Sequence, residues 1–178
     1  SRNFVNLFVS PLKISEIIVA LTVTALIRTL IGVIPATLLT IPLFGVSIFK
    51  LGLPLILLFI SLYIFGITLG LLVTAGLMRY GPAFENIAWS SLFLLAPLGC
   101  IYYPLSILPE SLQFVANLLP LVHIFEEVRS ILINNTVDYS NIMTALKLNL
   151  VYFAFGVLIF YLAFFQARKK GTLMNIGE

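Results

Sequence analysis

The sequence predicts an all-α membrane protein, a helical bundle of four transmembrane helices with an external re-entrant helical hairpin. Two observations lead to this fold class. Of the 178 residues, 61% are hydrophobic and 10% are charged, whereas a soluble domain carries about 25% charged residues. Most charges fall between long apolar runs, and one proline-bracketed stretch at 104–129 is polar. Lipid is therefore the expected solvent for much of the surface, and the polar stretch needs cover from protein or water at membrane depth.

Uncharged runs mark three of the four expected spans. They cover 51–78, 86–109 and 148–167, with lengths of 28, 24 and 20 residues. A helix rises about 1.5 Å per residue, so roughly 20 apolar residues cross about 30 Å of hydrocarbon. We place the corresponding spans at 51–78, 86–105 and 143–167.

The first apolar segment, 14–49, is too long for one upright crossing. Its only charges are Glu16 and Arg28, and its 36 residues would reach about 54 Å as a helix. No polar turn lies in its middle, so we expect one crossing rather than two. The excess length then requires a strong tilt, an interfacial part, or a bend at Pro35 or Pro42.

Arg28 is a candidate polar site within this first span. A charge at the centre of a span costs about 2.5–3.5 kcal/mol on insertion scales. A polar contact inside the bundle or along a transport path would offset that cost, or the long side chain could snorkel to the inner interface. Both interpretations stay open, and snorkelling is favoured because Arg28 lies nearer the inner end of an over-long helix.

Basic residues predict the orientation of the chain in a cell membrane. With the N-terminus inside, six lysines and arginines lie on the inner face and three on the outer face, as the positive-inside rule requires. The inner group includes the run 168–170. Both ends of the chain are then cytoplasmic, as is the loop 79–85, and the segment 106–142 is external.

The external segment 106–142 holds two short helical patterns. Pro109 suits the first turn of the first helix, because proline lacks the amide hydrogen that would be unpaired there, and Pro120 separates the two helices. Each helix is too short to cross the bilayer, yet one face of each is apolar enough to enter it. A re-entrant hairpin satisfies these patterns, since each helix pairs its own backbone groups. The polar face of the second helix carries His123, Glu126, Glu127 and Ser130.

Three residues of the hairpin form a candidate polar cluster near the outer side. Glu126 and Arg129 are three apart and can pair on the helix surface. His123 lies one turn before Glu126. An ordinary solvated helix face explains the same residues equally well, so the sequence leaves the two interpretations balanced.

Gly66 and Gly70 form a G-x-x-x-G pattern in the second span, and Thr74 continues this row of small residues. Such a row lets two helices approach closely. It predicts helix packing, more often within one chain than between subunits.

Several chemistries have no motif in this sequence. There is no G-x-x-x-x-G-K-[ST] loop for nucleotides, no H-E-x-x-H and no G-x-S-x-G. The single histidine, His123, cannot build a zinc site alone. The basic residues form no patch for nucleic acid, and the one cysteine, Cys100, reads as a buried thiol. We expect no enzyme, no metal and no cofactor in this chain, which leaves transport, conduction or scaffolding.

The first residues, 2–13, form an amphipathic stretch that is too short to span. Its apolar side chains include Phe4, Leu7 and Phe8. The stretch could lie on the membrane surface, or its aromatic residues could insert into a groove of a soluble partner.

The order of these segments resembles that of ABC-2 type permeases, the six-span membrane subunits of ABC exporters. The similarity lies in residues 6–12 with Glu16 following, in 96–109, and in 118–129. Together these stretches extend the resemblance over essentially the whole chain. Two further spans would precede Ser1 in such a permease, so the resemblance implies an N-terminal truncation.

The resemblance also implies partners and roles. It implies a homo- or heterodimer of permeases with two cytoplasmic ATPase subunits, which bind the ATP and Mg. It implies that residues 1–13 hold or adjoin the coupling helix and that the hairpin forms the outer gate. The coupling residues would be Arg2, Phe4, Leu7 and Phe8, and the gate residues His123, Glu126 and Arg129. The implied substrate is a drug, lipid or glycan; an ATPase-independent channel or secondary carrier, and a scaffold that transports nothing, are the alternatives.

Overall fold

The computed structural model describes residues 14–44 and 52–170, and this part of the chain folds into six α-helices and one 3-10 turn. The elements are α2 (Ile14–Phe44), α3 (Leu53–Tyr80), α4 (Phe84–Leu98), η2 (Leu105–Ile107), α5 (Glu110–Asn117), α6 (Pro120–Asn134) and α7 (Tyr139–Lys170). The prediction of an all-α protein is confirmed.

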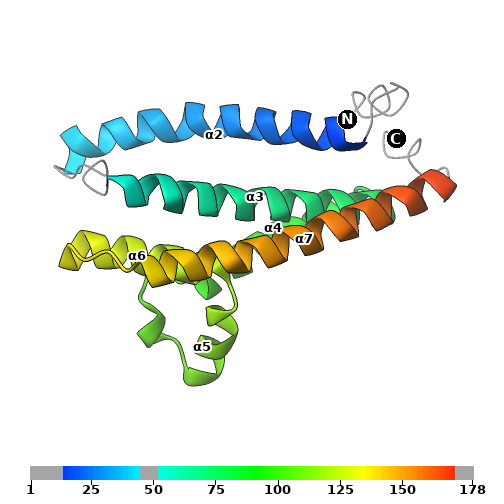
Figure 1. The fold of residues 1–178 in the computed structure, drawn as a ribbon. Coiled ribbons are helices and arrows are strands. Elements are labelled where there is room, and N and C mark those ends of the chain that lie inside the picture. Colours follow the sequence, from blue (N-terminus) through cyan, green and yellow to red (C-terminus); the bar gives the residue numbers. More distant parts are fainter. Residues whose placement is uncertain (1–13, 45–51, 171–178) are drawn as a thin grey trace.

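Three helices in the described ranges are long and apolar enough to cross a membrane. They are Ile18–Leu43 in α2, Leu53–Tyr80 in α3 and Tyr139–Lys169 in α7. Figure 1 shows the three running lengthwise through the molecule. Helix α2 continues through Pro35 and Pro42, so the described part of the first apolar segment, 14–44, is one helix and not a hairpin, as expected.

The remaining expected span, 86–105, differs from the helix that the structure contains. Helix α4 has 15 residues and ends at Leu98, so it rises only about 22 Å. The helix stops because Cys100 adopts a left-handed backbone conformation, with φ of 53°. The expectation that this helix continues to residue 105 was wrong, because turn residues follow Leu98 instead.

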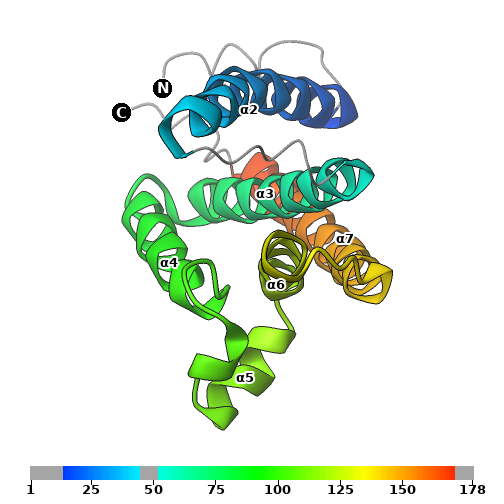
Figure 2. The same cartoon turned by 90° about the vertical axis from the view of Figure 1, so that its left-hand side faces the viewer.

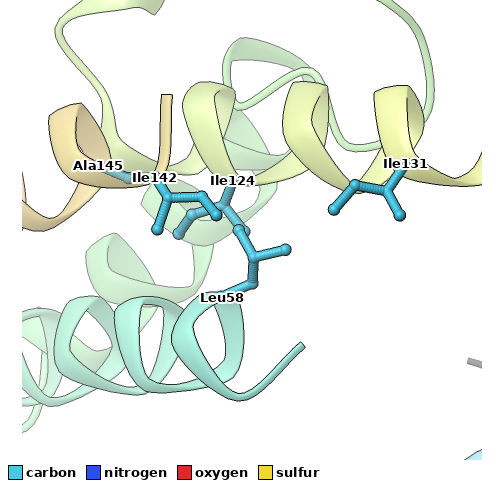
Figure 3. Packing of buried hydrophobic residues seen from close by; sticks show 5 residues of the cluster. All are labelled: Leu58, Ile124, Ile131, Ile142 and Ala145. Carbon is cyan, nitrogen blue, oxygen red and sulfur yellow. The ribbon is translucent and has the colours of Figure 1, made fainter. Parts of the chain in front are cut away.

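The core lies where α3 packs along α7, with α6 against both. Figure 2, viewed along the long helices, shows α6 and α7 on one side of α3 and α2 on the other. Figure 3 shows the cluster at the α6 end, where one leucine of α3 meets isoleucines of α6 and α7. Its buried members are Leu58, Ile124, Ile131, Ile142 and Ala145. A second cluster lies at the other end of the contact between α3 and α7. Its buried members are Leu71, Met78, Phe160, Phe164 and Ala167.

The predicted pair of short helices, α5 and α6, is present, and α5 projects away from the long helices (Figure 2). Pro109 immediately precedes α5, and its carbonyl accepts the amide hydrogen of Leu112 at 2.9 Å. Pro120 is the first residue of α6, where its missing amide hydrogen and fixed φ suit a helix start.

The closest approach of a glycine to the neighbouring helix in the α3–α7 contact occurs at Gly156 of α7. A Cβ atom added there would lie 3.1 Å from Cγ2 of Thr68 and 3.5 Å from its carbonyl oxygen. Thr68 is itself buried and donates its hydroxyl to the carbonyl of Ile64 at 2.9 Å. A small residue at 156 therefore sets the distance between the two best-packed spans.

We expect Gly156→Leu to destabilise the fold by about 1–3 kcal/mol, the usual cost of overpacking a core. The leucine would push α7 away from Thr68. The measurement is resistance to unfolding in mixed detergent micelles. Gly32→Leu is the matched control, because an added Cβ at Gly32 meets nothing within 4 Å. Equal resistance of the two variants would contradict the close approach at Gly156.

Candidate functional site

The candidate site is a set of charged contacts that joins α6 to the turn after α4. Nη1 of Arg129 lies 2.6 Å from Oε1 of Glu126. Nη2 of Arg129 donates to the carbonyl oxygens of Cys100 and Tyr103, both at 3.0 Å. Oε1 of Glu126 also accepts the amide hydrogen of Leu105 at 2.8 Å. We call these five residues the Arg129 clamp.

The clamp provides hydrogen-bond partners for backbone groups that lie outside any helix, namely the carbonyls of Cys100 and Tyr103 and the amide of Leu105. The chain between Leu98 and Leu105 is irregular, and the end of α4 leaves carbonyl groups without intrahelical partners. Irregular backbone at membrane depth persists only where protein or water satisfies it. The planar guanidinium of Arg129 reaches two carbonyls and a carboxylate together, which a lysine ammonium on its flexible stem does less well.

The structure brings together two of the three predicted hairpin residues. The expected pairing of Glu126 with Arg129 is present. Nε2 of His123 instead lies 3.0 Å from the carbonyl oxygen of Asn117, the last residue of α5. His123 thus joins the two hairpin helices, and the gate role of all three residues stays a prediction.

Glu127 corrects the expectation that it lies on the polar face of α6. Its side chain is fully buried. Oε1 accepts the amide hydrogen of Asp138 at 2.7 Å, and Oε2 lies 3.5 Å from Nδ2 of Asn141. The spacing could have indicated this, because Glu127 falls on the same stripe as Ile124 and Ile131, at i+3 and i−4.

Glu127 therefore fixes the start of α7 to α6. Asp138 caps α7 by accepting the amide hydrogen of Ser140 at 2.8 Å, and the amide of Asp138 is held by Glu127. A carboxylate near a helix N-terminus is also favoured by the helix dipole. The hairpin and the last span are joined in this way.

A buried polar contact between α3 and α7 was missed from the sequence. Nδ2 of Asn149 donates to the carbonyl oxygen of Ser61 at 2.8 Å and to its hydroxyl at 2.6 Å. Both side chains are fully buried. Such interhelical hydrogen bonds hold spans together where no water competes. The sequence indicated this contact only by placing one asparagine, Asn149, in the uncharged run 148–167.

Of the other predicted site residues, Arg28 belongs to α2, which lies on the far side of α3 from α6. Arg28 is exposed on α2, about 15 Å along the helix from Ile18, and both interpretations of its charge stay open. The expected coupling residues fall outside the described residues; they are Arg2, Phe4, Leu7 and Phe8.

Gly66 and Gly70 face a cavity of about 590 Å³ between α2 and α3. An added Cβ at either glycine would meet nothing within 4 Å. These glycines do not closely approach another helix in the described part of the chain, and their predicted role in helix packing stays a prediction.

Long apolar helices, a short helical hairpin and a charged clamp define a multi-pass helical membrane protein. Within 14–44 and 52–170, no group of three or more His, Cys, Asp or Glu side chains could hold a metal ion. Residues 1–133 match the family model of the ABC-2 type transporter. The chain belongs to this family and is a membrane permease domain rather than an ATPase. No curated protein and no solved structure matches it significantly.

Proposed function

We propose that this chain is the membrane-spanning subunit of an ATP-driven exporter. It works with a separate ATPase subunit, which binds ATP and Mg, and with a second permease copy, identical or related. Its substrate is a drug, lipid or glycan-type molecule. The family supports a permease with an ATPase partner, and the apolar spans suit a substrate that moves within or beside the bilayer.

The observation that carries the mechanism is the chain of contacts from α4 to α7. The Arg129 clamp joins the turn after α4 to α6, and Glu127 joins α6 to Asp138, the residue before α7, and to Asn141 near its start. Rigid elements with two discrete arrangements transmit coupling between distant sites. We infer that α4, the hairpin and the start of α7 move as one body when the outer gate opens.

The proposed topology has four spans in this chain, with both of its ends in the cytoplasm. Helix α4 serves as most of the third span. The turn held by the Arg129 clamp and the hairpin then carry the chain to the outer face of the membrane. In Figure 1 the start of α2 and the end of α7 lie at the same end of the molecule, which supports termini on one side. Arg168 and Lys169 near the end of α7 favour the inner side.

The ATPase is proposed to act on the segment 1–13. Closure of the ATPase subunits would push the region around Phe4 and Phe8, and the long spans would tilt to open a path toward the outside. Pro35 and Pro97 lie inside helices, where proline frees carbonyls and permits bending.

The test is the double substitution Phe4→Asp with Phe8→Asp in the intact protein. Two charges in an apolar groove are unpaired and poorly solvated, so we expect at least a tenfold loss of co-purifying ATPase subunit and of ATP-driven transport. Val5→Asp is the matched control, since it adds a charge between these residues. Unchanged ATPase binding in the double variant means that the coupling assignment is wrong. Transport without any ATPase would favour a channel or carrier.

A further inference from the structure

Helices α3 and α7 each bury a row of residues spaced seven apart. On α3 the row consists of Pro54, Ser61, Thr68 and Ala75, and on α7 it consists of Ile142, Asn149, Gly156 and Ala163. At each level, the α7 residue lies 88 positions after its α3 counterpart. We call these eight residues the α3–α7 seam.

Contacts at two neighbouring levels establish that the two rows face each other. Nδ2 of Asn149 donates to the carbonyl oxygen of Ser61 at 2.8 Å and to its hydroxyl oxygen at 2.6 Å. One level further on, a Cβ atom added to Gly156 would lie 3.1 Å from Cγ2 of Thr68. The seam therefore follows the middle of the contact between the two helices.

The spacing is that of a parallel helix pair packed as in a coiled coil. The two helices run in the same direction, because their first turns pack together in one cluster and their last turns in another (Figures 1 and 3). A repeat of seven residues keeps one stripe of each helix facing its partner. In such a pair, one polar residue at a seam position selects the register, because a shift leaves its hydrogen bonds unmade.

Most side chains of the seam are small, so their apolar packing specifies the register weakly. Small residues let two backbones approach closely, but they project few groups that would resist a rotation or a shift of one helix on the other. The layer of Ser61 and Asn149 differs from the others because its hydrogen bonds are directional. Both bonds need Nδ2 of Asn149 to lie beside Ser61.

This polar layer adds little net stability. Oδ1 of Asn149 is buried, and no group within 14–44 or 52–170 donates a hydrogen bond to it. A buried acceptor without a donor has a cost that offsets the two bonds made by Nδ2. A buried polar group that is only partly satisfied is less favourable than apolar groups of similar shape. Stability alone therefore does not account for an asparagine at 149, whereas selection of a register does.

We propose that Asn149 is a positioning residue, which selects the register and the facing of α7 on α3. Its bonds to Ser61 form only when α7 presents this residue to α3, and the same register brings Gly156 onto Thr68. Because Glu127 joins α6 to the start of α7, the register also places the hairpin relative to α3. This role depends on the contact between two helices and not on the proposed export of a substrate.

A disulfide between the two helices reports the register. Thr68→Cys with Gly156→Cys, in a chain that also carries Cys100→Ala, places one thiol on each helix. A Cβ atom at 156 would lie 3.8 Å from Cα of Thr68, and the Cβ atoms of a disulfide are about 3.5–4.5 Å apart. The rate of intramolecular disulfide formation in lipid vesicles, with copper phenanthroline as the oxidant, measures how often α7 has this facing.

Two apolar variants and one exchange test the role of the amide in this background. Asn149→Leu with Ser61→Ala replaces the polar layer by apolar groups, and Asn149→Val does so with a smaller side chain. We expect the disulfide to form at least about fivefold more slowly in both, with unchanged or higher resistance to unfolding in mixed detergent micelles while the thiols are reduced. Ser61→Asn with Asn149→Ser rebuilds the layer from opposite helices and should return the rate to within about twofold of the unaltered value.

Asn86→Leu is the matched control, because it removes an exposed asparagine from α4; its disulfide rate should equal that of the unaltered protein. A rate that stays unchanged in both apolar variants overturns the proposal. Unfolding of both variants at a lower fraction of denaturing detergent would make Asn149 an ordinary stabilising contact, which also overturns it. The same holds if the exchange of Ser61 and Asn149 fails to restore the rate.

Discussion

Glu127→Ala is expected to destabilise the protein by about 2–4 kcal/mol. The substitution removes a part-buried hydrogen bond from the amide of Asp138 to a carboxylate, and hydrogen bonds to charged groups contribute about 1.5–3 kcal/mol. It also leaves a void where a fully buried side chain packed. Because Asp138 caps α7, the loss should loosen the junction between the hairpin and the last span.

Two further variants separate this role from the loss of a charge. Glu127→Gln keeps an oxygen acceptor for the amide of Asp138, so most of the stability should remain. Glu110→Ala removes an exposed glutamate and should change stability by less than about 0.5 kcal/mol. Unfolding in mixed detergent micelles, followed by fluorescence of Trp89, measures all three. If the Glu127→Ala and Glu110→Ala variants unfold at the same detergent composition, Glu127 does not hold the start of α7.

Arg129→Gln is expected to lower transport at least tenfold and stability by about 2–3 kcal/mol. The change removes a charged partner of Glu126 and the donor to two carbonyls, and hydrogen bonds to charged groups contribute about 1.5–3 kcal/mol each. The stability loss stays below the sum of these bonds, because both side chains of the pair are partly exposed, at 23% and 31%.

A substitution of Glu126, which pairs with Arg129, and a control substitution complete this measurement. Glu126→Gln loses the ion pair yet retains an acceptor for the amide of Leu105, so its effect should be smaller than that of Arg129→Gln. Lys147→Ala removes an exposed cation of α7 and should transport normally. Transport and unfolding are measured on the same preparations in lipid vesicles and detergent. Unaltered transport by both clamp variants would remove the hairpin from the gate.

The hairpin shows which features local sequence patterns can predict. Pro109 and Pro120 predict the starts of α5 and α6 because proline lacks an amide hydrogen and has a fixed φ. The pairing of Glu126 with Arg129 follows from their spacing on one helix face. The acceptors of Arg129 could not be predicted, since Cys100 and Tyr103 are 29 and 26 residues away and only folding brings them near.

Glu127 and α4 show where the patterns mislead. A glutamate beside another glutamate suggests a solvated face, although the stripe of Ile124 and Ile131 includes Glu127. The groups that pair with Glu127 are 11 and 14 residues away along the chain, and no local pattern identifies them. The uncharged run of 24 residues at 86–109 suggests a full span, because hydropathy ignores backbone conformation. The left-handed conformation at Cys100, stabilised by contacts from Arg129, ends the helix earlier.

Composition and periodicity alone determine that this chain is a bundle of long apolar helices with a short polar hairpin. Each span pairs its own backbone, and its need for a hydrocarbon solvent depends only on its own residues. Tertiary packing alone decides which backbone groups the charged side chains of the hairpin bind. Glu127 and Arg129 acquire their roles from backbone groups of α7 and of the turn after α4, and a sequence pattern contains no distances between them.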